Sequence, residues 1–205
     1  MKKILIATHN ESKKKELLYG LKGLMRKGLQ AVTLNDLNIN DEPEETGKTF
    51  QQNSMLKAKF YANLTYLPTI ADDGGLIIPY LNNEPGVKSR RWPGYEASDE
   101  ELIKYTLSHL KGVIGVNRTA YLETCVCFYD PVAQTFACEQ ERIKGRISEK
   151  PLNIETKGYP FRTLFIVEKY NKYYDELTKE EHEKENHRLK ALKRLVKRIE
   201  KNLIE

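Results

Sequence analysis

The sequence contains no hydrophobic run that could cross a membrane. A spanning helix needs roughly 18 consecutive apolar residues, and no stretch of the chain approaches that length. The first apolar run follows two lysines, as in a signal peptide, but it ends after about five residues, short of the ~7–15 of a signal core. A charged segment without a cleavage site comes next. We therefore expect this run to be a first β-strand and the protein to be cytoplasmic.

Cysteine is scarce, with three residues at positions 125, 127 and 138. The odd number and the spacing exclude a disulfide-rich scaffold and the usual zinc motifs. Cys125 and Cys127 are two positions apart on a predicted strand, so their side chains share one face. We interpret all three as small core residues in a reducing compartment. A redox or metal role would need further partners, which the sequence does not offer.

Linkers, internal repeats and low-complexity stretches are also absent. The 205 residues are 40% hydrophobic and 31% charged, with a net charge of +5, which is typical of a globular protein. A chain of this length can bury a sizeable core. We therefore expect one domain spanning residues 1–205.

The hydrophobic spacing predicts strands and helices in alternation, and hence an α/β fold with a central mixed sheet. A strand over residues 3–8 should precede a helix that ends near Gly20 to Gly23. A helix over residues 50–64, capped by Thr49 and Gln52, should bury its apolar side chains. The side chains expected near that buried side are Phe50, Leu56, Phe60 and Leu64. Further strands are expected near residues 31–34, 69–71, 121–128, 135–143 and 164–167, and further helices from Ser98 and over residues 188–203.

The first segment that suggests phosphate chemistry lies between the first strand and the first helix. Thr8, Asn10 and Ser12 are polar residues at a helix start, where free backbone N–H groups and the helix dipole favour an anion. Lys13 adds a full positive charge. The glycine pattern of a Walker loop is absent. Asn10 or Ser12 could equally serve only as the helix cap, so both interpretations stay open.

The second feature is acidic. Asp72 and Asp73 follow an apolar strand, and Glu44 and Glu45 lie in an earlier loop. Adjacent aspartates in a turn repel each other unless a cation or hydrogen-bond donors compensate them. Mg²⁺ binds carboxylate and triphosphate oxygens together, and a carboxylate off the metal could activate water. An acidic surface turn is the alternative. Lys57, on the following helix, could face the triphosphate or could simply be solvated.

Taken together, these segments resemble the inosine triphosphate pyrophosphatase family over essentially the whole chain. That family hydrolyses non-standard purine nucleoside triphosphates to monophosphates and pyrophosphate. The matching segments, in chain order, are Thr8-x-Asn10-x-x-Lys13, Glu44-Glu45-Thr46-Gly47-x-Thr49-Phe50, Asn53-x-x-Leu56-Lys57-Ala58, Leu67-Pro68-x-x-Ala71-Asp72-Asp73-x-Gly75-Leu76, Pro85-Gly86-Val87-x-Ser89-x-Arg91, Glu176-Leu177-Thr178 and His187-Arg188-x-x-Ala191-Leu192.

The resemblance implies an elongated α/β structure with a long central mixed sheet, two lobes around a substrate cleft, and a homodimer. It also implies Mg²⁺ as cofactor, with Glu45, Asp72 and Asp73 at the metal. Asp73 and Lys57 are the implied catalytic residues. The implied substrate-binding residues are Thr8, Asn10, Lys13, Gly74, Tyr159, Phe161, Arg162, His182, His187 and Arg188. Of these, His187 and Arg188 are expected to recognise the base.

The sequence departs from the family where the base should bind. The family typically has Phe-Gly-Tyr-Asp-Pro, whereas this chain has Tyr159-Pro160-Phe161-Arg162-Thr163, which reverses the charge of the acidic position. His182 stands where a lysine is usual, and Gly74 where a serine is common. The same hydrolysis on a modified or pyrimidine nucleotide is therefore an alternative.

Two alternatives are not enzymes. One is a nucleotide sensor that keeps the binding site without turnover. The other is a nucleic-acid-binding protein, because residues 188–201 carry seven basic residues and one acid, Glu200. Those basic residues flank a stripe of Leu, Val and Ile and fit the solvated face of a helix. We therefore expect a nucleoside triphosphate as partner, and neither nucleic acid nor a membrane.

Overall fold

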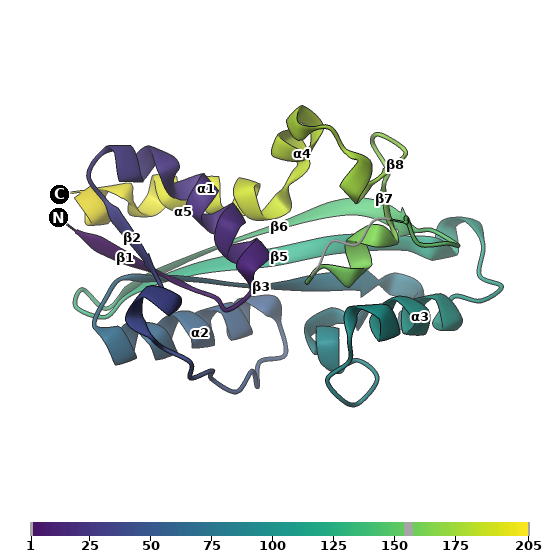
Figure 1. Cartoon of the computed structure of the whole chain (residues 1–205), viewed down its shortest axis with the longest axis horizontal. Helices are drawn as coiled ribbons and strands as arrows, with labels where there is room; N and C mark the ends of the chain where they lie inside the picture. Colours follow the sequence, from purple (N-terminus) through teal and green to yellow (C-terminus); the bar gives the residue numbers. More distant parts are fainter. Residues whose placement is uncertain (1, 154–157, 205) are drawn as a thin grey trace. The chain divides into compact units, whose positions relative to one another are not determined.

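A mixed β-sheet with helices packed against it forms the framework of the protein (Figure 1). The computed structural model describes residues 2–153 and 158–204. The strands hydrogen-bond in the order β2-β1-β3-β5-β6-β7-β8, and β4 pairs with β3. Strand β1 is parallel to β2 and β3, whereas β4, β7 and β8 pair antiparallel to their neighbours. The predicted α/β fold with a mixed sheet is confirmed.

The elements follow the chain in the predicted alternation. The strands are β1 (Lys3–Ala7), β2 (Gln30–Thr33), β3 (Thr69–Ile78), β4 (Glu84–Pro85), β5 (Thr119–Asp130), β6 (Thr135–Ile147), β7 (Phe165–Val167) and β8 (Lys172–Tyr173). The α-helices are α1 (Glu11–Arg26), α2 (Phe50–Thr65), α3 (Asp99–His109), α4 (Lys179–Glu185) and α5 (His187–Ile204). Within the described residues, none of these helices is long and apolar enough to span a bilayer.

The chain divides into two compact units. The first unit contains residues 1–73, 124–141 and 188–205, and the second contains residues 74–123 and 142–187. Each unit has a hydrophobic cluster of its own. Strands β3, β5 and β6 contribute residues to both units, so the change from one to the other falls within strands. In the first unit, α1 and α5 cover one face of the sheet and α2 covers the other (Figure 1).

Helix α1 is longer than predicted, because its two glycines do not end it. It continues through Gly20 and Gly23 to Arg26. A Cβ atom on Gly20 would lie 2.4 Å from a methyl carbon of Leu192 on α5. Gly20 therefore permits close packing of α1 against α5. The helix ends instead near Gly28, whose φ of +95° is a left-handed conformation that suits glycine.

Helix α2 covers the predicted residues but buries a different face. Leu64 is 50% exposed and Phe60 37% exposed, so the predicted buried side is wrong for both. The buried side chains are Phe50, Asn53, Ser54, Ala58, Tyr61 and Ala62, with helical spacing. Two of these are polar because they bond to β3: the Ser54 hydroxyl donates to the carbonyl of Ala71 at 3.0 Å. The face of α2 that packs against the sheet is therefore the one that carries these two polar side chains.

Strand β3 corrects the prediction of an acidic turn. It runs without interruption from Thr69 to Ile78, so Asp72 and Asp73 lie inside a strand. Successive side chains of a strand point to opposite faces. The two carboxylates are therefore directed to different sides of the sheet, and both residues are buried.

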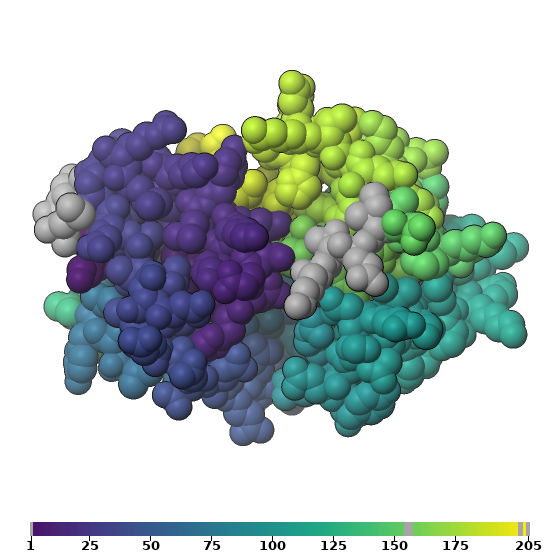
Figure 2. Space-filling model, viewed as in Figure 1, coloured from purple at the N-terminus to yellow at the C-terminus, as the bar shows by residue number. Residues whose placement is uncertain are grey.

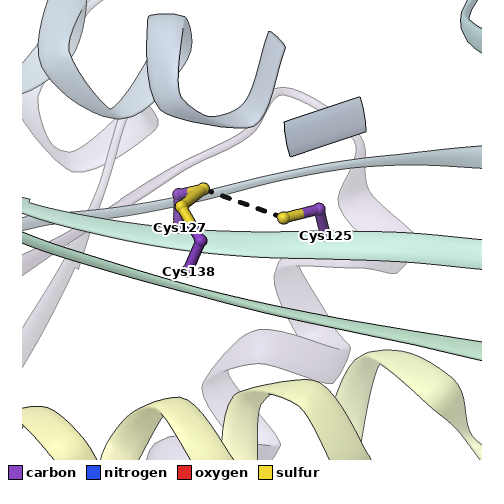
Figure 3. A group of neighbouring side chains, drawn as sticks. All are labelled: Cys125, Cys127 and Cys138. Atoms are coloured by element: carbon purple, nitrogen blue, oxygen red, sulfur yellow. Dashed lines mark hydrogen bonds between the residues drawn. A yellow bond between two sulfur atoms is a disulfide. The ribbon is translucent and has the colours of Figure 1, made fainter. Parts of the chain in front are cut away.

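The cysteines differ from the prediction that all three are free. Cys127 on β5 and Cys138 on β6 form a disulfide, and their Cα atoms are 4.2 Å apart (Figure 3). The pairing of β5 with β6 brings Cys138 next to Cys127, which the spacing of the cysteines in the sequence did not reveal. Cys125 lies outside the disulfide and is buried, as predicted. Its Sγ lies 3.8 Å from that of Cys127, which confirms that the two share one face of β5.

Candidate active site

The turn between β1 and α1 is built by side-chain hydrogen bonds. The Thr8 hydroxyl accepts the backbone N–H of Asn10 at 3.2 Å. The Asn10 side-chain oxygen accepts the N–H groups of Ser12 and Lys13 at 3.0 and 3.1 Å, so Asn10 caps α1. The capping interpretation is confirmed, and phosphate binding at the same turn stays a prediction. In Figure 2 the purple N-terminal part of the chain reaches the surface of the first unit.

Asp72 is held between two cations on one face of β3. The ammonium of Lys13, in the first turn of α1, lies 3.2 Å from Asp72 Oδ2. Arg188 Nε, at the start of α5, donates to the same oxygen at 2.9 Å. Burial alone would raise the pKa of the Asp72 carboxyl, but the charges of Lys13 and Arg188 outweigh it and hold the pKa far below its ordinary value. Asp72 is therefore ionised.

The second oxygen of Asp72 is different. Oδ1 is buried and has no hydrogen-bond partner among the residues that the structure describes. A buried carboxylate oxygen without a partner is costly, because desolvation is not compensated. This oxygen has the free lone pairs that a cation or a donor could use.

Asp73 faces α2, on the other side of the strand. The Asn53 amide donates to Asp73 Oδ2 at 3.2 Å, and the Lys57 ammonium lies 3.5 Å from Oδ1. The Thr124 hydroxyl of β5 donates to the main-chain oxygen of Asp73 at 3.1 Å. Burial raises the pKa of the Asp73 carboxyl, and the positive charges of Lys57 and Lys13 only partly offset it. The two neighbouring aspartates thus have pKa shifts of opposite sign, a pattern found where one carboxylate binds and the other exchanges protons.

Lys57 joins Asp73 to the acidic loop. Its ammonium lies 2.8 Å from Glu45 Oε1, and only 14% of its side chain is exposed. Burial on its own would lower the pKa of Lys57, but the carboxylates of Asp73 and Glu45 raise it above its ordinary value. Lys57 is therefore a fixed positive charge between two acids, and of the two alternatives the one in which it is simply solvated is wrong.

Asn53 connects the loop to the strand and was given no role by sequence reasoning. Its side-chain oxygen accepts the N–H of Gly47 at 2.7 Å, while its amide nitrogen binds Asp73. A Cβ atom on Gly47 would lie 2.4 Å from that oxygen, so only glycine permits this approach. The signal was a polar pair, Asn53 and Ser54, on the side of α2 that the sheet covers. The incorrect helix phase concealed it.

Glu16 and Thr124 were also missed. Glu16 Oε2 lies 2.5 Å from Nη1 of Arg188, so the guanidinium bridges Glu16 and Asp72. Arg188 is only 2% exposed. The structure therefore shows Arg188 bound to carboxylates of the first unit, and recognition of the base by His187 and Arg188 stays a prediction. A glutamate one helical turn after Lys13 is common on any surface helix, so sequence alone gave no signal for Glu16.

The second unit gathers another part of the predicted site. The Arg162 guanidinium carbon lies 3.5 Å from the ring centre of Tyr159 and 4.7 Å from that of Tyr174. Arg162 is 6% exposed, so its charge is buried against aromatic faces. The His182 ring packs edge-on against Tyr174, with 5.2 Å between ring centres. Phe161 belongs to the hydrophobic cluster of this unit.

The remaining predicted residues, Gly74 and His187, lie at the sequence positions where the chain passes from one unit to the other. Gly74 follows Asp73 on β3 and is the first residue of the second unit. His187 is the last residue of the second unit and begins α5; it is 5% exposed. The structure thus brings together Thr8, Asn10, Lys13, Glu45, Lys57, Asp72, Asp73 and Arg188 within the first unit, and Tyr159, Arg162 and His182 within the second.

The basic face of α5 is partly neutralised within the first unit. Arg194 pairs with Glu139 and Glu141 of β6, and Arg198 pairs with Glu139. Together with the Arg188–Asp72 pair, these contacts give several of the positive charges of α5 an acidic partner in the same chain. They support the prediction that the basic residues form the outer face of a packed helix.

Comparison with known proteins points to the same family as the motifs. The model of the Ham1 family matches residues 4–198. The dITP/XTP pyrophosphatase of Leptospira interrogans is 36% identical over 197 residues, which is 96% of each chain. That of Bacillus subtilis is 36% identical over 200 residues, 98% of each chain.

Solved structures agree with the sequence relatives. The Ham1 protein from Coxiella burnetii superposes with a TM-score of 0.84 at 29% identity, over 98% of this chain and all of that one. The Staphylococcus aureus Ham1 protein gives 0.82 at 27% identity, with the same coverage. The resemblance inferred from the motifs is confirmed across the length of the chain.

Proposed function

The chain belongs to the Ham1 family, and from this premise we propose that it hydrolyses non-standard purine nucleoside triphosphates to the monophosphate and pyrophosphate. ITP, dITP and XTP are the proposed substrates, and removal of these nucleotides from the pool is the proposed role. The dITP/XTP pyrophosphatases that are 36% identical to this chain support the substrate class. The whole chain, residues 1–205, is proposed to act as one pyrophosphatase domain.

One observation carries the proposal: buried charges of both signs meet at Asp72 and Asp73. Lys13 and Lys57 come from different helices and contact the two carboxylates from opposite faces of β3. A triphosphate is the polyanion that such ammonium groups bind, and adjacent carboxylates with different pKa values suit hydrolysis of its anhydride bond. A purely structural ion pair would not need an acid on each face.

The acidic set fits a magnesium ion. Asp72 Oδ1 is a buried carboxylate oxygen without a hydrogen-bond partner among the described residues, and Glu45 and Asp73 add carboxylates of the same unit. Oxygen-only donors of this kind suit Mg²⁺, which uses one or two carboxylates together with substrate phosphates. We therefore propose that the ion is held among Glu45, Asp72 and Asp73, with Asp73 left off the metal as the catalytic carboxylate. When bound, the ion would stabilise the negative charge that develops as the anhydride bond breaks.

The chain's own residues have distinct proposed roles. Asp73 accepts a proton from the attacking water, and burial, which raises the pKa of its carboxyl, makes it a stronger base. Lys57 neutralises the phosphate charge beside it. Thr8, Asn10 and Lys13 bind phosphate at the start of α1, where the helix dipole and the Lys13 ammonium favour an anion. Arg188 keeps Asp72 ionised and in place, through its bonds to Asp72 and Glu16.

The base is proposed to bind residues of the second unit. Tyr159, Phe161 and Arg162 supply aromatic faces and a guanidinium, and His182 and His187 supply ring nitrogens. A guanidinium donates hydrogen bonds and never accepts them. It therefore favours carbonyl-bearing base edges, such as the 6-oxo group of hypoxanthine, over amino groups. Gly74 is proposed to allow close approach of the substrate to β3.

The position of Arg162 also favours a second candidate: the same hydrolysis on a modified or pyrimidine nucleotide. Its guanidinium is buried against Tyr159 and Tyr174, an arrangement that differs from the acid usual in the family. Pyrimidines also carry a 2-oxo group that a guanidinium can recognise. We further propose a homodimer in the cytoplasm, and the molar mass from light scattering during gel filtration checks the dimer.

Pyrophosphate release across a panel of triphosphates tests both candidates. ITP, dITP, XTP, the standard nucleotides and modified pyrimidine triphosphates are compared, each with and without Mg²⁺. The main proposal expects the highest kcat/KM for ITP, dITP or XTP and loss of activity in a chelator. A clear preference for a pyrimidine would select the second candidate. Release of single phosphates in place of pyrophosphate would contradict both.

A further inference from the structure

Three sulfur atoms form a compact group where β5 and β6 pair in the first unit. Cys127 and Cys138 are disulfide-bonded, and the thiol of Cys125 lies 3.8 Å from the sulfur of Cys127 (Figure 3). All three sulfur atoms lie within 4.8 Å of one another. One disulfide with a thiol in contact is the arrangement in which thiol–disulfide exchange takes place. Neither the family membership nor the proposed hydrolysis uses this group.

A surface hollow lies beside the disulfide, with Gln51 between them. It has a volume of about 530 Å³ and is lined by Thr49, Gln51, Gln52, Met55, Leu56, Lys59 and Phe136. The main-chain oxygen of Gln51 is also 3.8 Å from Cys127 Sγ, so the hollow and the disulfide share a wall. Cys138 is partly exposed, whereas Cys127 is buried. Phe136 lies two positions before Cys138 on β6, on the same face of the strand.

We propose that Cys127 and Cys138 form a reversible redox-modification site that reacts with a small anionic thiol of the glutathione type in this hollow. The size of the hollow suits a tripeptide rather than a protein partner. Lys59 supplies a positive charge that attracts an anionic thiol and favours its thiolate form. The sulfur of the attacking thiolate reaches Cys138 and not Cys127, because Cys127 is buried.

The exchange balances in two steps. A glutathione thiolate attacks Cys138 Sγ, the Cys127–Cys138 bond breaks, and Cys127 leaves as a thiolate that takes up a proton. A second glutathione thiolate attacks the glutathione sulfur of the mixed disulfide and releases Cys138 as a thiolate, which is protonated in turn. Two electrons pass from two glutathione molecules to the protein, and glutathione disulfide is the other product. Oxidation follows the same steps in reverse.

Cys125 has a defined part in the first step. In the disulfide Cys127 carries no proton, so a hydrogen bond across this 3.8 Å contact has Cys125 as its donor. The same S–H can stabilise the Cys127 thiolate as it leaves. Loss of Cys125 should therefore slow reduction of the disulfide without preventing its formation.

The sulfur group is linked to Asp73 from two directions, and this coupling rests on the proposed hydrolase function. Thr124, next to Cys125 on β5, donates to the main-chain oxygen of Asp73. Gln51, in the first turn of α2, precedes Asn53, which binds the Asp73 carboxylate. After reduction, Cys127 gains a proton that it can donate to the Gln51 carbonyl. We expect this extra bond to steady the first turn of α2, so that the reduced form hydrolyses triphosphate about threefold faster.

The experiment equilibrates the full-length protein with reduced and oxidised glutathione at a series of ratios. Acid quenching, alkylation under denaturing conditions and peptide mass spectrometry then count the free thiols at each cysteine. We expect Cys127 and Cys138 to lose their thiols together as a two-electron couple, and Cys125 to remain alkylatable. Pyrophosphate release from ITP is measured on the same samples. If no triphosphate is hydrolysed in any sample, the proposed function fails while the thiol counts still decide the couple.

Variants separate the parts of the proposal. Cys138→Ser should abolish the couple and fix the rate at that of the reduced form, whereas Cys125→Ala should keep the couple and slow its reduction. Lys59→Gln should slow reaction with glutathione more than reaction with uncharged 2-mercaptoethanol. The proposal is overturned if Cys127 and Cys138 stay reduced at every glutathione ratio. Equal hydrolysis rates in the two forms would overturn the coupling to Asp73.

Discussion

The two units hold their buried charges in different ways. In the first unit, Asp72 and Asp73 are each matched by cations from remote parts of the chain, namely Lys13, Arg188 and Lys57. In the second unit, the Arg162 guanidinium lies against two tyrosine rings. A carboxylate between fixed cations tolerates little change, because removal of one partner leaves a buried charge uncompensated. The attraction between a guanidinium and an aromatic face is weaker, about 0.5–2 kcal/mol.

This difference accounts for the pattern of family motifs. The residues of the first unit match the family almost position by position, whereas Tyr159-Pro160-Phe161-Arg162-Thr163 departs from it. If the first unit sets the reaction and the second unit the base, their variants should change different measured quantities. First-unit variants should lower kcat or stability for every nucleotide, and second-unit variants should change the ranking of nucleotides.

The largest effect is expected for Asp73→Asn. The amide keeps the size of the side chain but cannot accept a proton from water, so kcat should fall by about 10²–10⁴-fold. Asn53 and Lys57 still surround the position, so substrate binding should be retained. Steady-state pyrophosphate release and calorimetric titration with a slowly hydrolysed triphosphate analogue measure the two quantities. Asp41→Asn, an exposed acid of the same unit, serves as the control. An equal fall in kcat for every nucleotide would support the division; equal activity of variant and wild type would remove Asp73 from the chemistry.

Arg188→Met should destabilise the fold by about 3 kcal/mol, because the buried Asp72 would keep Lys13 but lose its hydrogen-bonded partner. Arg198→Met is the matched control, since Arg198 lies on the same helix but its pair with Glu139 is exposed. A surface pair contributes about 1 kcal/mol or less. Urea unfolding in a chelator measures both. Similar losses in the two variants would contradict the importance of burial.

The pH dependence of the same variant sharpens this test. The folded-state pKa of Asp72 lies below its ordinary value of 3.8, so the ionised carboxylate stabilises the folded protein. That contribution is present above pH 3.8 and is lost as the pH falls towards the lower folded-state pKa. Arg188→Met raises the folded-state pKa, so acid unfolding should begin at higher pH than in wild type. Circular dichroism during acid titration, in a chelator, shows the shift; an unchanged midpoint would mean that Lys13 alone holds the charge.

The sequence predicted the longer helices and strands and most of the polar residues, but not β4, β8 and α4, and not the faces that the elements bury. A strand at residues 69–71 was recognised, yet the charged pair after it suggested a turn, although Asp72 and Asp73 continue β3. Alternation along that strand is what gives the two carboxylates opposite surroundings. On α2, the hydrophobic residues Leu64 and Phe60 indicated the wrong buried face. Two hydrogen bonds, made by Asn53 and Ser54, place the opposite face of the helix against the sheet.

Contacts between remote segments were beyond the sequence. Gly20 suggested a helix end. In the structure it instead leaves room for the side chain of Leu192, more than 170 residues later in the chain. The Cys127–Cys138 bond depends on the pairing of β5 with β6, and the Glu16–Arg188 pair on the packing of α1 with α5. Local patterns specify periodicity and caps, whereas these contacts exist only after the sheet and helices have assembled.

A smaller effect is expected for Glu45→Gln, with Glu44→Gln as its control. Glu45 pairs with Lys57, while its neighbour Glu44 is exposed. Loss of one metal carboxylate should raise the Mg²⁺ concentration for half-maximal rate by about 10-fold, within the range found when metal ligands are weakened. The Glu44 variant should not change it. Pyrophosphate release against Mg²⁺ concentration measures both, and equal behaviour of the two variants would remove Glu45 from the metal site.

The smallest expected effect, and the one that tests the second unit, is that of Arg162→Lys compared with Arg162→Gln. Lysine keeps the charge but loses the planar group that stacks on Tyr159, and glutamine loses the charge but keeps a donor. If Arg162 recognises a base carbonyl, both variants should lower kcat/KM for the preferred nucleotide about fivefold relative to ATP, since one hydrogen bond contributes about 1 kcal/mol. The rate at saturation should hardly change, because the carboxylates of the first unit are untouched. A uniform loss for all nucleotides would instead mean that the guanidinium only supports Tyr159 and Tyr174, and base recognition would then have to come from His182 or His187.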